Sequence, residues 1–248
     1  MKSSLSSIKQ VLPLLLIAVV AGCATKEPPF NAATALNDAE GNMQKANFDK
    51  ARKLYQEIQE KSPDKSYDAA IMLRISDTYF GDEKYEEALV EYQNFLNYHP
   101  VSKDAAYAQF QIAMCSFLQL TTIDRDPEPT RTALREFQKL IQKYPGSVYR
   151  ETAAKNSAIC RDRLSEYELY VGRFYYRKKS YRAAVGRFDK LLQDFPDSAS
   201  EKDALYYKGL SEFAMGEKAR ARATFETLVV KYPSMTDKVV PLMRKNSS

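Results

Sequence analysis

The sequence predicts an all-α protein in which about five helix pairs stack in chain order. A unit of 16 residues that ends in proline recurs along the chain, and 37 residues separate Pro63 from Pro100 and Pro196 from Pro233. The composition agrees, because 17 tyrosines and 12 phenylalanines stand against only 8 glycines, which suits packed helices. The recurring units are residues 48–63, 85–100, 130–145, 181–196 and 218–233.

Each unit places a small, an aromatic and an apolar residue at intervals of four and then three. This spacing puts the three side chains on one face of a helix, and the proline ends that helix. A helix pair of this kind cannot bury its apolar stripe alone, so the pairs are expected to stack. The small residues are Ala51, Ala88, Ala133, Ala184 and Ala221, and the aromatic ones are Tyr55, Tyr92, Phe137, Phe188 and Phe225.

The N-terminus has the features of a secretory leader. Lys2 and Lys9 precede the apolar run 11–21, which is shorter than the roughly 20 residues needed to span a bilayer. The run ends in VAGC, which resembles a bacterial lipobox and implies cleavage before Cys23 and lipidation of that cysteine. An ordinary signal peptide or a membrane-anchored helix is the alternative. We therefore expect a cleaved signal peptide at 1–22 and a lipidated tether at 23–30. Ala24, in place of aspartate, favours the outer membrane.

The body of the chain is divided into repeats by the proline positions. We expect repeats 1–3 in residues 31–146, and a long helix with repeats 4 and 5 in residues 147–235. A C-terminal tail, 236–248, contains a possible capping helix at 236–245. The expected pairs are 31–45 with 48–61, 67–81 with 85–98, 103–120 with 129–143, 148–178 with 180–194, and 201–215 with 217–231.

Two stretches interrupt the period. Residues 121–129 (TTIDRDPEP) are charged and rich in proline, and this is typical of an exposed loop that acts either as a spacer or as a docking segment. Residues 147–178 contain no proline and one glycine, Gly172, and they predict a single helix of about 30 residues, roughly 45 Å long. A break near 163–165 is the competing interpretation.

The first helices of the pairs also carry small residues, 12 positions before the small residue of the second helix. Ser76, Gly172 and Gly209 occupy this position. The pattern resembles the tetratricopeptide repeat, although the chain has no tryptophan and has Ala39 where glycine is common. The resemblance implies a solenoid of helix pairs.

The residues predict no enzyme, cofactor or metal site. His99 is the only histidine of the sequence, so a two-histidine metal motif is excluded, and no glycine-rich phosphate loop is present. Cys115 and Cys160 each lie 15 residues after a repeat proline, and we expect two buried free thiols, with a disulfide as the alternative. Without the leader the formal charge falls from +5 to about +3, which argues against nucleic acid as a partner.

Binding is the remaining class of function. Stacked pairs present their first helices on one surface, and tyrosine and arginine suit peptide recognition because they offer contact area together with hydrogen bonds. In the N-terminal half the candidate peptide-binding residues are Tyr67, Arg74, Tyr79 and Phe80. Packing within the repeats is the alternative role for each tyrosine.

Residues 23–235 resemble the BamD-type lipoproteins of the outer-membrane β-barrel assembly machinery. The segments that carry this resemblance are the lipobox at Cys23, DRDP at 124–127, RDRL at 161–164, YELYVGRFYY at 167–176 and AAVGR at 183–187. The long-helix segment is the most specific of these, because a generic repeat protein has no reason to carry it.

The resemblance implies a scaffold anchored to the outer membrane through Cys23 and facing the periplasm. Its first repeats would bind C-terminal, aromatic-ended segments of unfolded outer-membrane proteins. Its later repeats would dock periplasmic domains of the barrel insertase, together with accessory assembly lipoproteins. An alternative is a tetratricopeptide lipoprotein that tethers cell-wall, division or export proteins. The expected docking residues are Asp124, Arg125, Arg173, Tyr175 and Arg187, with an acidic partner for Arg187.

Overall fold

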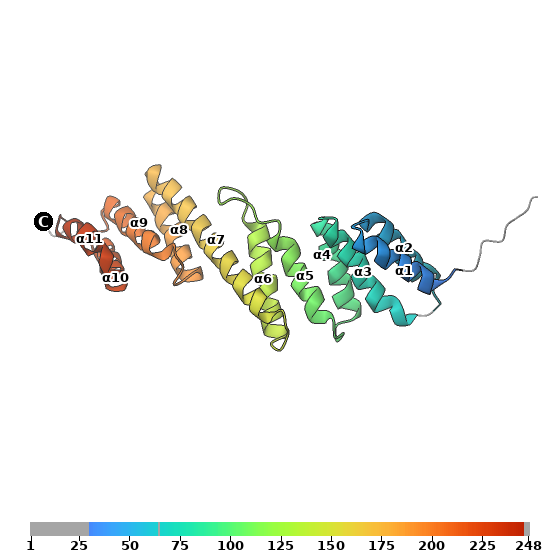
Figure 1. Ribbon diagram of the computed structural model, residues 1–248. Coiled ribbons are helices and arrows are strands. Elements are labelled where there is room, and N and C mark those ends of the chain that lie inside the picture. Colours follow the sequence, from blue (N-terminus) through green and yellow to red (C-terminus); the bar gives the residue numbers. More distant parts are fainter. Residues whose placement is uncertain (1–29, 64, 246–248) are drawn as a thin grey trace, which may run out of the picture. The chain divides into compact units, whose positions relative to one another are not determined.

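The computed structural model describes residues 30–63 and 65–245, and this part of the chain is helical with no strand (Figure 1). Cys23, the expected signal peptide and nearly all of the tether lie outside the described residues. From Ala32 on, the chain forms one compact unit. Its helices are α1 (Ala32–Gln44), α2 (Phe48–Lys61), α3 (Asp68–Gly81), α4 (Tyr85–Tyr98), α5 (Ala105–Phe117), α6 (Glu128–Lys143), α7 (Arg150–Arg177), α8 (Tyr181–Asp194), α9 (Glu201–Ala214), α10 (Lys218–Lys231) and α11 (Thr236–Lys245), with short 3-10 helices η1 (Lys65–Tyr67) and η2 (Pro233–Met235).

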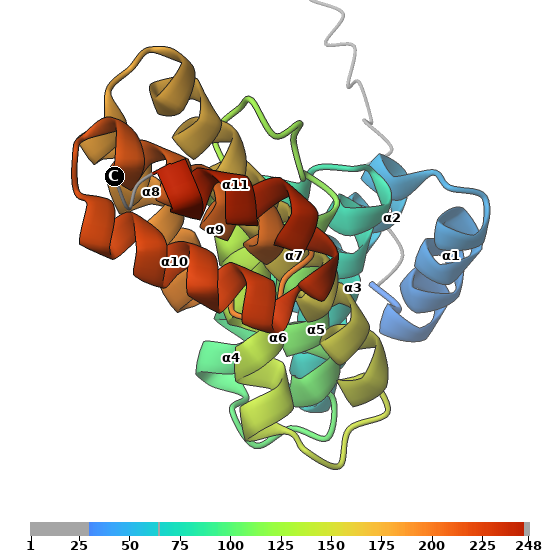
Figure 2. The same ribbon diagram turned by 90° about the vertical axis from the view of Figure 1, so that its left-hand side faces the viewer.

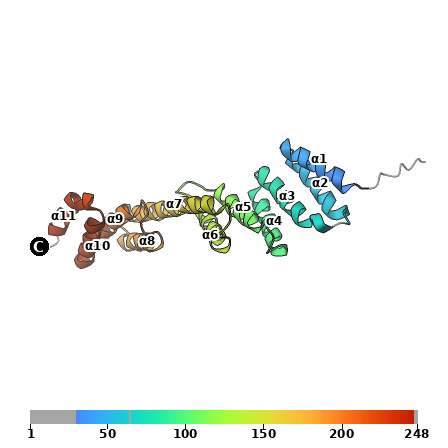
Figure 3. The same ribbon diagram turned by 60° about the horizontal axis from the view of Figure 1, so that its bottom comes forward.

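The all-α solenoid predicted from the repeats is confirmed. Each helix from α1 to α10 packs against the next one along the chain, and Figure 3 shows this order. Most expected helix bounds lie within one or two residues of the observed ones, and the third pair differs most, because α5 begins at Ala105 and ends at Phe117. The expected capping helix is α11, which packs on α10 in the C-terminal part of the molecule (Figure 2).

The repeated residues form the core. All five aromatic side chains of the repeat are fully buried, and so are the five alanines that precede them. Each second helix ends before its proline because the residue before a proline is disfavoured in helical conformation. In the second unit, α4 ends at Tyr98, two residues before Pro100. The backbone N–H of the capping residue, His99, donates to the carbonyl of Phe95 at 2.8 Å.

Two glycines lie where paired helices approach each other closely. A Cβ atom at Gly172 would lie 2.4 Å from the Phe188 ring of the next helix, and one at Gly209 would lie 2.5 Å from the Phe225 ring. The small residue 12 positions before the second alanine therefore provides the room that the buried aromatic ring occupies.

The stretch 147–178 contains one helix, α7, of 28 residues, which corresponds to about 42 Å at 1.5 Å per residue. The alternative of a break near 163–165 is wrong. Ser165 lies within the helix, where its hydroxyl donates to the carbonyl of Asp162 at 2.7 Å and approaches the hydroxyl of Ser200. The helix packs against α6, α8 and α9.

Cys115 and Cys160 are buried free thiols. Burial raises the pKa of Cys115 to about 12 and that of Cys160 to about 11. We expect neither thiol of the folded chain to react with iodoacetamide at pH 8, because the thiolate is the reactive form. Mass spectrometry should find both sulfurs alkylated only after denaturation. Rapid alkylation of either thiol under native conditions would contradict this burial.

Candidate functional site

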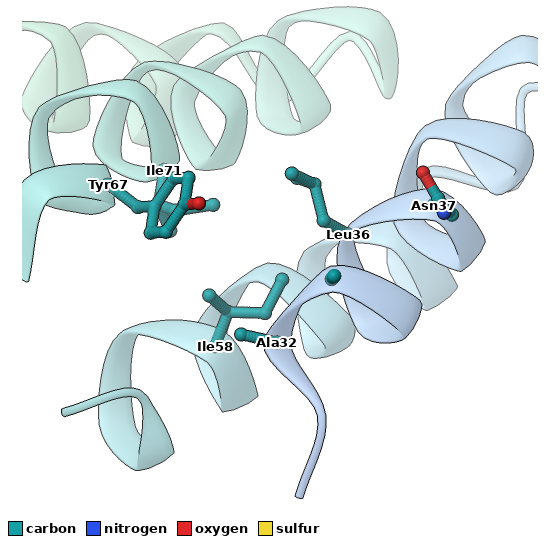
Figure 4. A pocket seen from close by; sticks show the side chains of 7 residues that line it. Ala32, Leu36, Asn37, Ile58, Tyr67 and Ile71 are labelled. Carbon is teal, nitrogen blue, oxygen red and sulfur yellow. The ribbon is translucent and has the colours of Figure 1, made fainter. Parts of the chain in front are cut away.

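An apolar pocket of about 120 Å³ lies between α1, α2 and α3 (Figure 4). The close-up shows Leu36 of α1 opposite Tyr67 and Ile71, with Ile58 of α2 below them. An apolar cavity of roughly 150 Å³ can hold benzene, so this pocket has the size of one bulky side chain. The lining residues are Ala32, Ala33, Leu36, Asn37, Ile58, Tyr67 and Ile71.

The local structure explains why Tyr67 lies at this pocket. The turn after Pro63 contains η1, whose last residue is Tyr67, and α3 begins directly after it. Tyr67, Ile71 and Arg74 follow one another at intervals of four and three, so they share one face of α3. Tyr67 keeps 45% of its surface exposed and is therefore available to a ligand.

Arg74 lies next to the pocket on this face and links two helices. Its Nε atom is 2.9 Å from a carboxylate oxygen of Glu40 in α1, and its Nη1 atom is 3.4 Å from Asp77. The Arg74 side chain nevertheless keeps 46% of its surface exposed. The Arg74 side chain is thus held by two carboxylates and is still accessible to a ligand.

Arg74 also lines a hollow of about 400 Å³ between α3 and the start of α5. Asp77 forms part of its wall, and the hydroxyls of Tyr92 and Tyr107 donate to one Asp77 oxygen at 2.6 and 2.7 Å. Burial raises the pKa of Asp77, and the hydrogen bonds from the two tyrosines and from Arg74 oppose that shift. The face of α3 therefore has an apolar pocket on one side of Arg74 and a polar hollow on the other.

The structure separates the four candidate peptide-binding residues. Tyr67 and Arg74 lie together at the hollows just described, whereas Tyr79 and Phe80 lie at the other end of α3. The guanidinium of Arg52 is 3.9 Å from the centre of the Tyr79 ring, and the rings of Phe80 and Tyr85 are 5.5 Å apart. Both side chains are half-buried and pack against the core of the second repeat, which is the alternative that the sequence left open.

Among the pocket residues, Leu36 and Ile71 are large apolar side chains that the sequence did not single out, whereas Ile58 is the apolar residue of the first repeat unit. Ile58 and Ile71 are 2% exposed, so they combine a core position with a wall of the pocket. The available signal was Leu36, an apolar residue on α1, the first helix of the described residues.

Arg187 forms an ion pair within the chain. Its Nη1 atom lies 3.1 Å from the carboxylate of Glu168, a residue of α7 whose side chain is 2% exposed. Lys190 and Arg131 approach the other oxygen of Glu168 at 3.8 Å each. The ion pair joins α7 to α8, while 37% of the Arg187 side chain stays exposed. An interface role for Arg187 remains a prediction.

Two of the expected docking residues lie in the loop between α5 and α6. The hydroxyl of Thr122 donates to Asp124 at 2.6 Å and lowers the pKa of that carboxyl, and Arg125 is exposed. Arg163 of α7 donates to the carbonyl of Thr121 at 3.3 Å. The loop that contains DRDP and the helix that contains RDRL, which are distant in sequence, therefore meet.

The two docking candidates of α7 differ in exposure. Arg173 is exposed, and its guanidinium lies 5.1 Å from the centre of the Tyr207 ring. Tyr175 is half-buried and packs against the core that α7, α8 and α9 share. Arg173 is thus the more accessible of the two.

Within the described residues, no helix is both long and apolar enough to cross a membrane.

The comparison with known proteins agrees with the resemblance drawn from the sequence. Three relatives, each named outer membrane protein assembly factor BamD, come from Rickettsia prowazekii (26% identical, covering 91% of this chain and 92% of the relative), Caulobacter vibrioides (23%, covering 90% and 75%) and Vibrio cholerae (24%, covering 77% and 85%). A family model described as "YfiO: Outer membrane lipoprotein" matches residues 30–228. Since this match spans most of the sequence, the chain belongs to the YfiO family of outer membrane lipoproteins.

Proposed function

We propose that this protein is an assembly factor for outer-membrane proteins, anchored by lipid at Cys23 and facing the periplasm. Its first repeats bind C-terminal segments of unfolded barrel proteins, and its later repeats hold the barrel insertase and accessory lipoproteins. The family and the names of its relatives support the general role. The observation that carries the substrate-binding part is the apolar pocket beside the half-exposed Arg74.

The binding mechanism follows from the two kinds of contact on α3. An aromatic side chain near the end of the substrate enters the pocket between Leu36, Tyr67 and Ile71, where it leaves water. The terminal carboxylate then lies against the open edge of the Arg74 guanidinium, where a charge-assisted hydrogen bond is stronger than a neutral one. Glu40 and Asp77 hold that guanidinium in position, so little conformational entropy is lost on binding.

Replacing Tyr67 with alanine tests this pocket. We expect the variant to bind a fluorescent peptide that ends in phenylalanine about tenfold more weakly, because a half-exposed aromatic anchor is lost. Fluorescence anisotropy with the full chain in detergent gives the dissociation constant. Tyr98→Ala is the matched control, since Tyr98 is a 75% exposed tyrosine of α4 outside the pocket. Equal affinity of the two variants would place the substrate site elsewhere.

A further inference from the structure

A second hollow, of about 250 Å³, lies between the α5–α6 loop and the C-terminal half of α7. Ile123 of the loop forms one wall, and Tyr170 of the helix forms another. Arg173 and Arg177, one and two turns beyond Tyr170, form the basic edge of the hollow. We call this hollow, together with the neighbouring Phe174, the α7 groove.

The cations at and beyond this groove lack acidic partners within the described part of the chain. Four of the six residues 177–182 are Arg or Lys, and all four are exposed. Among residues 30–63 and 65–245, no carboxylate lies within 4 Å of these four side chains or of Arg173. This contrasts with Arg187 and Lys190 on the neighbouring helix, which surround Glu168. Glu166 is the single acid that lines the hollow, so the groove has a net positive charge.

The same groove exposes large apolar side chains. Ile123, Tyr170 and Phe174 each keep about 40% of their surface exposed (41, 39 and 42%). Isolated exposed apolar residues are normal on protein surfaces. Here Ile123 of the loop and Tyr170 of α7 line one hollow, and Phe174 follows Tyr170 by one helical turn. The exposed apolar side chains are therefore clustered beside Arg173 and Arg177.

We propose that the α7 groove binds an acidic segment of a partner protein that carries an aliphatic or aromatic side chain. Carboxylates of the segment pair with Arg173 and Arg177, and its apolar side chain packs between Ile123 and Tyr170. The walls of the hollow favour a protein segment over a lipid surface, which would need charges on an open face. The inference rests on the proposed function, in which the later repeats form the docking half, and it adds a docking contact on α7.

The test uses a fluorescent peptide of alternating glutamate and leucine and the full chain in detergent. We expect the double variant Arg173→Gln and Arg177→Gln to raise the dissociation constant about tenfold, since two charge pairs are lost. Lys179→Gln with Arg182→Gln removes the same charge outside the groove and is expected to change the dissociation constant less than about twofold. Ile123→Asn, at an exposed loop position, should weaken binding without affecting the fold.

Three results would overturn the inference. Equal weakening by the two double variants would mean diffuse attraction, and equal affinity for a peptide of glutamate and glycine would exclude an apolar contact. Co-sedimentation with phosphatidylglycerol vesicles that depends on these cations, in the absence of peptide binding, would assign them to a lipid surface. The phenylalanine-ended peptide, measured with the same variants, separates the two proposals, because its affinity depends on Tyr67 and is expected to stay unchanged.

Discussion

Replacing Arg187 with glutamate is expected to lower the free energy of unfolding by about 3 kcal/mol, because it removes the partner of a buried charge and adds a second carboxylate. Glu168 is 2% exposed, and Arg187 is its closest cation, at 3.1 Å. Lys190 and Arg131 remain, but at 3.8 Å and from partly exposed positions they compensate only in part. Urea denaturation followed by circular dichroism measures the change.

Arg182→Glu is the matched control for this prediction. Arg182 lies on the same helix, α8, but it is exposed and has no carboxylate within 4 Å in the described residues. Its reversal is expected to change stability by less than about 0.5 kcal/mol. If both variants were equally stable, the ion pair between Arg187 and Glu168 would contribute nothing to the free energy of unfolding. A docking experiment at position 187 should therefore use Arg187→Gln, which adds no negative charge, and should report stability together with partner binding.

Gly172→Ala is expected to destabilise the chain by about 1–3 kcal/mol, the usual cost of overpacking a core. The new Cβ would lie 2.4 Å from a ring carbon of Phe188, which is fully buried, so the ring or the helices would have to shift. Gly209→Ala should behave in the same way, because its Cβ would lie 2.5 Å from the ring of Phe225. Thermal and urea denaturation measure both variants.

The control for the glycine series is the same substitution at an open position. Gly186 lies within α8, and a Cβ there would meet nothing within 4 Å. Gly186→Ala is therefore expected to stabilise the chain by up to about 1 kcal/mol, because alanine has the higher helix propensity. If Gly172→Ala were also stabilising, the helices α7 and α8 would have to be further apart than the structure shows.

The helices were predictable because the residues that form the core repeat at a fixed spacing. Ala184 and Phe188 share a helical face, and both are fully buried, as the pattern indicates. The long helix α7 was predictable for a different reason, because its sequence contains no proline. These features depend on contacts between residues that are close in sequence or in equivalent repeats.

The candidate site was only partly predictable, because it depends on how the pairs are placed against each other. Tyr67 and Tyr79 are both tyrosines of the expected helix 67–81. Tyr67 lines the apolar pocket, whereas the ring of Tyr79 stacks against the guanidinium of Arg52. Arg187 and Glu168 are 19 residues apart and on different helices, so no helical spacing pairs them. The α7 groove likewise needs Ile123, which comes from a loop whose position the repeat does not define.

The length of α7 has a consequence for cooperativity. In an ordinary solenoid each repeat contacts only its neighbours, so terminal repeats can open while the others stay folded. α7 packs against α6, α8 and α9, and it therefore contributes to three successive repeats with a single hydrogen-bonded helix. Melting any of these repeats exposes part of the same helix, and the centre of the molecule behaves as one cooperative unit.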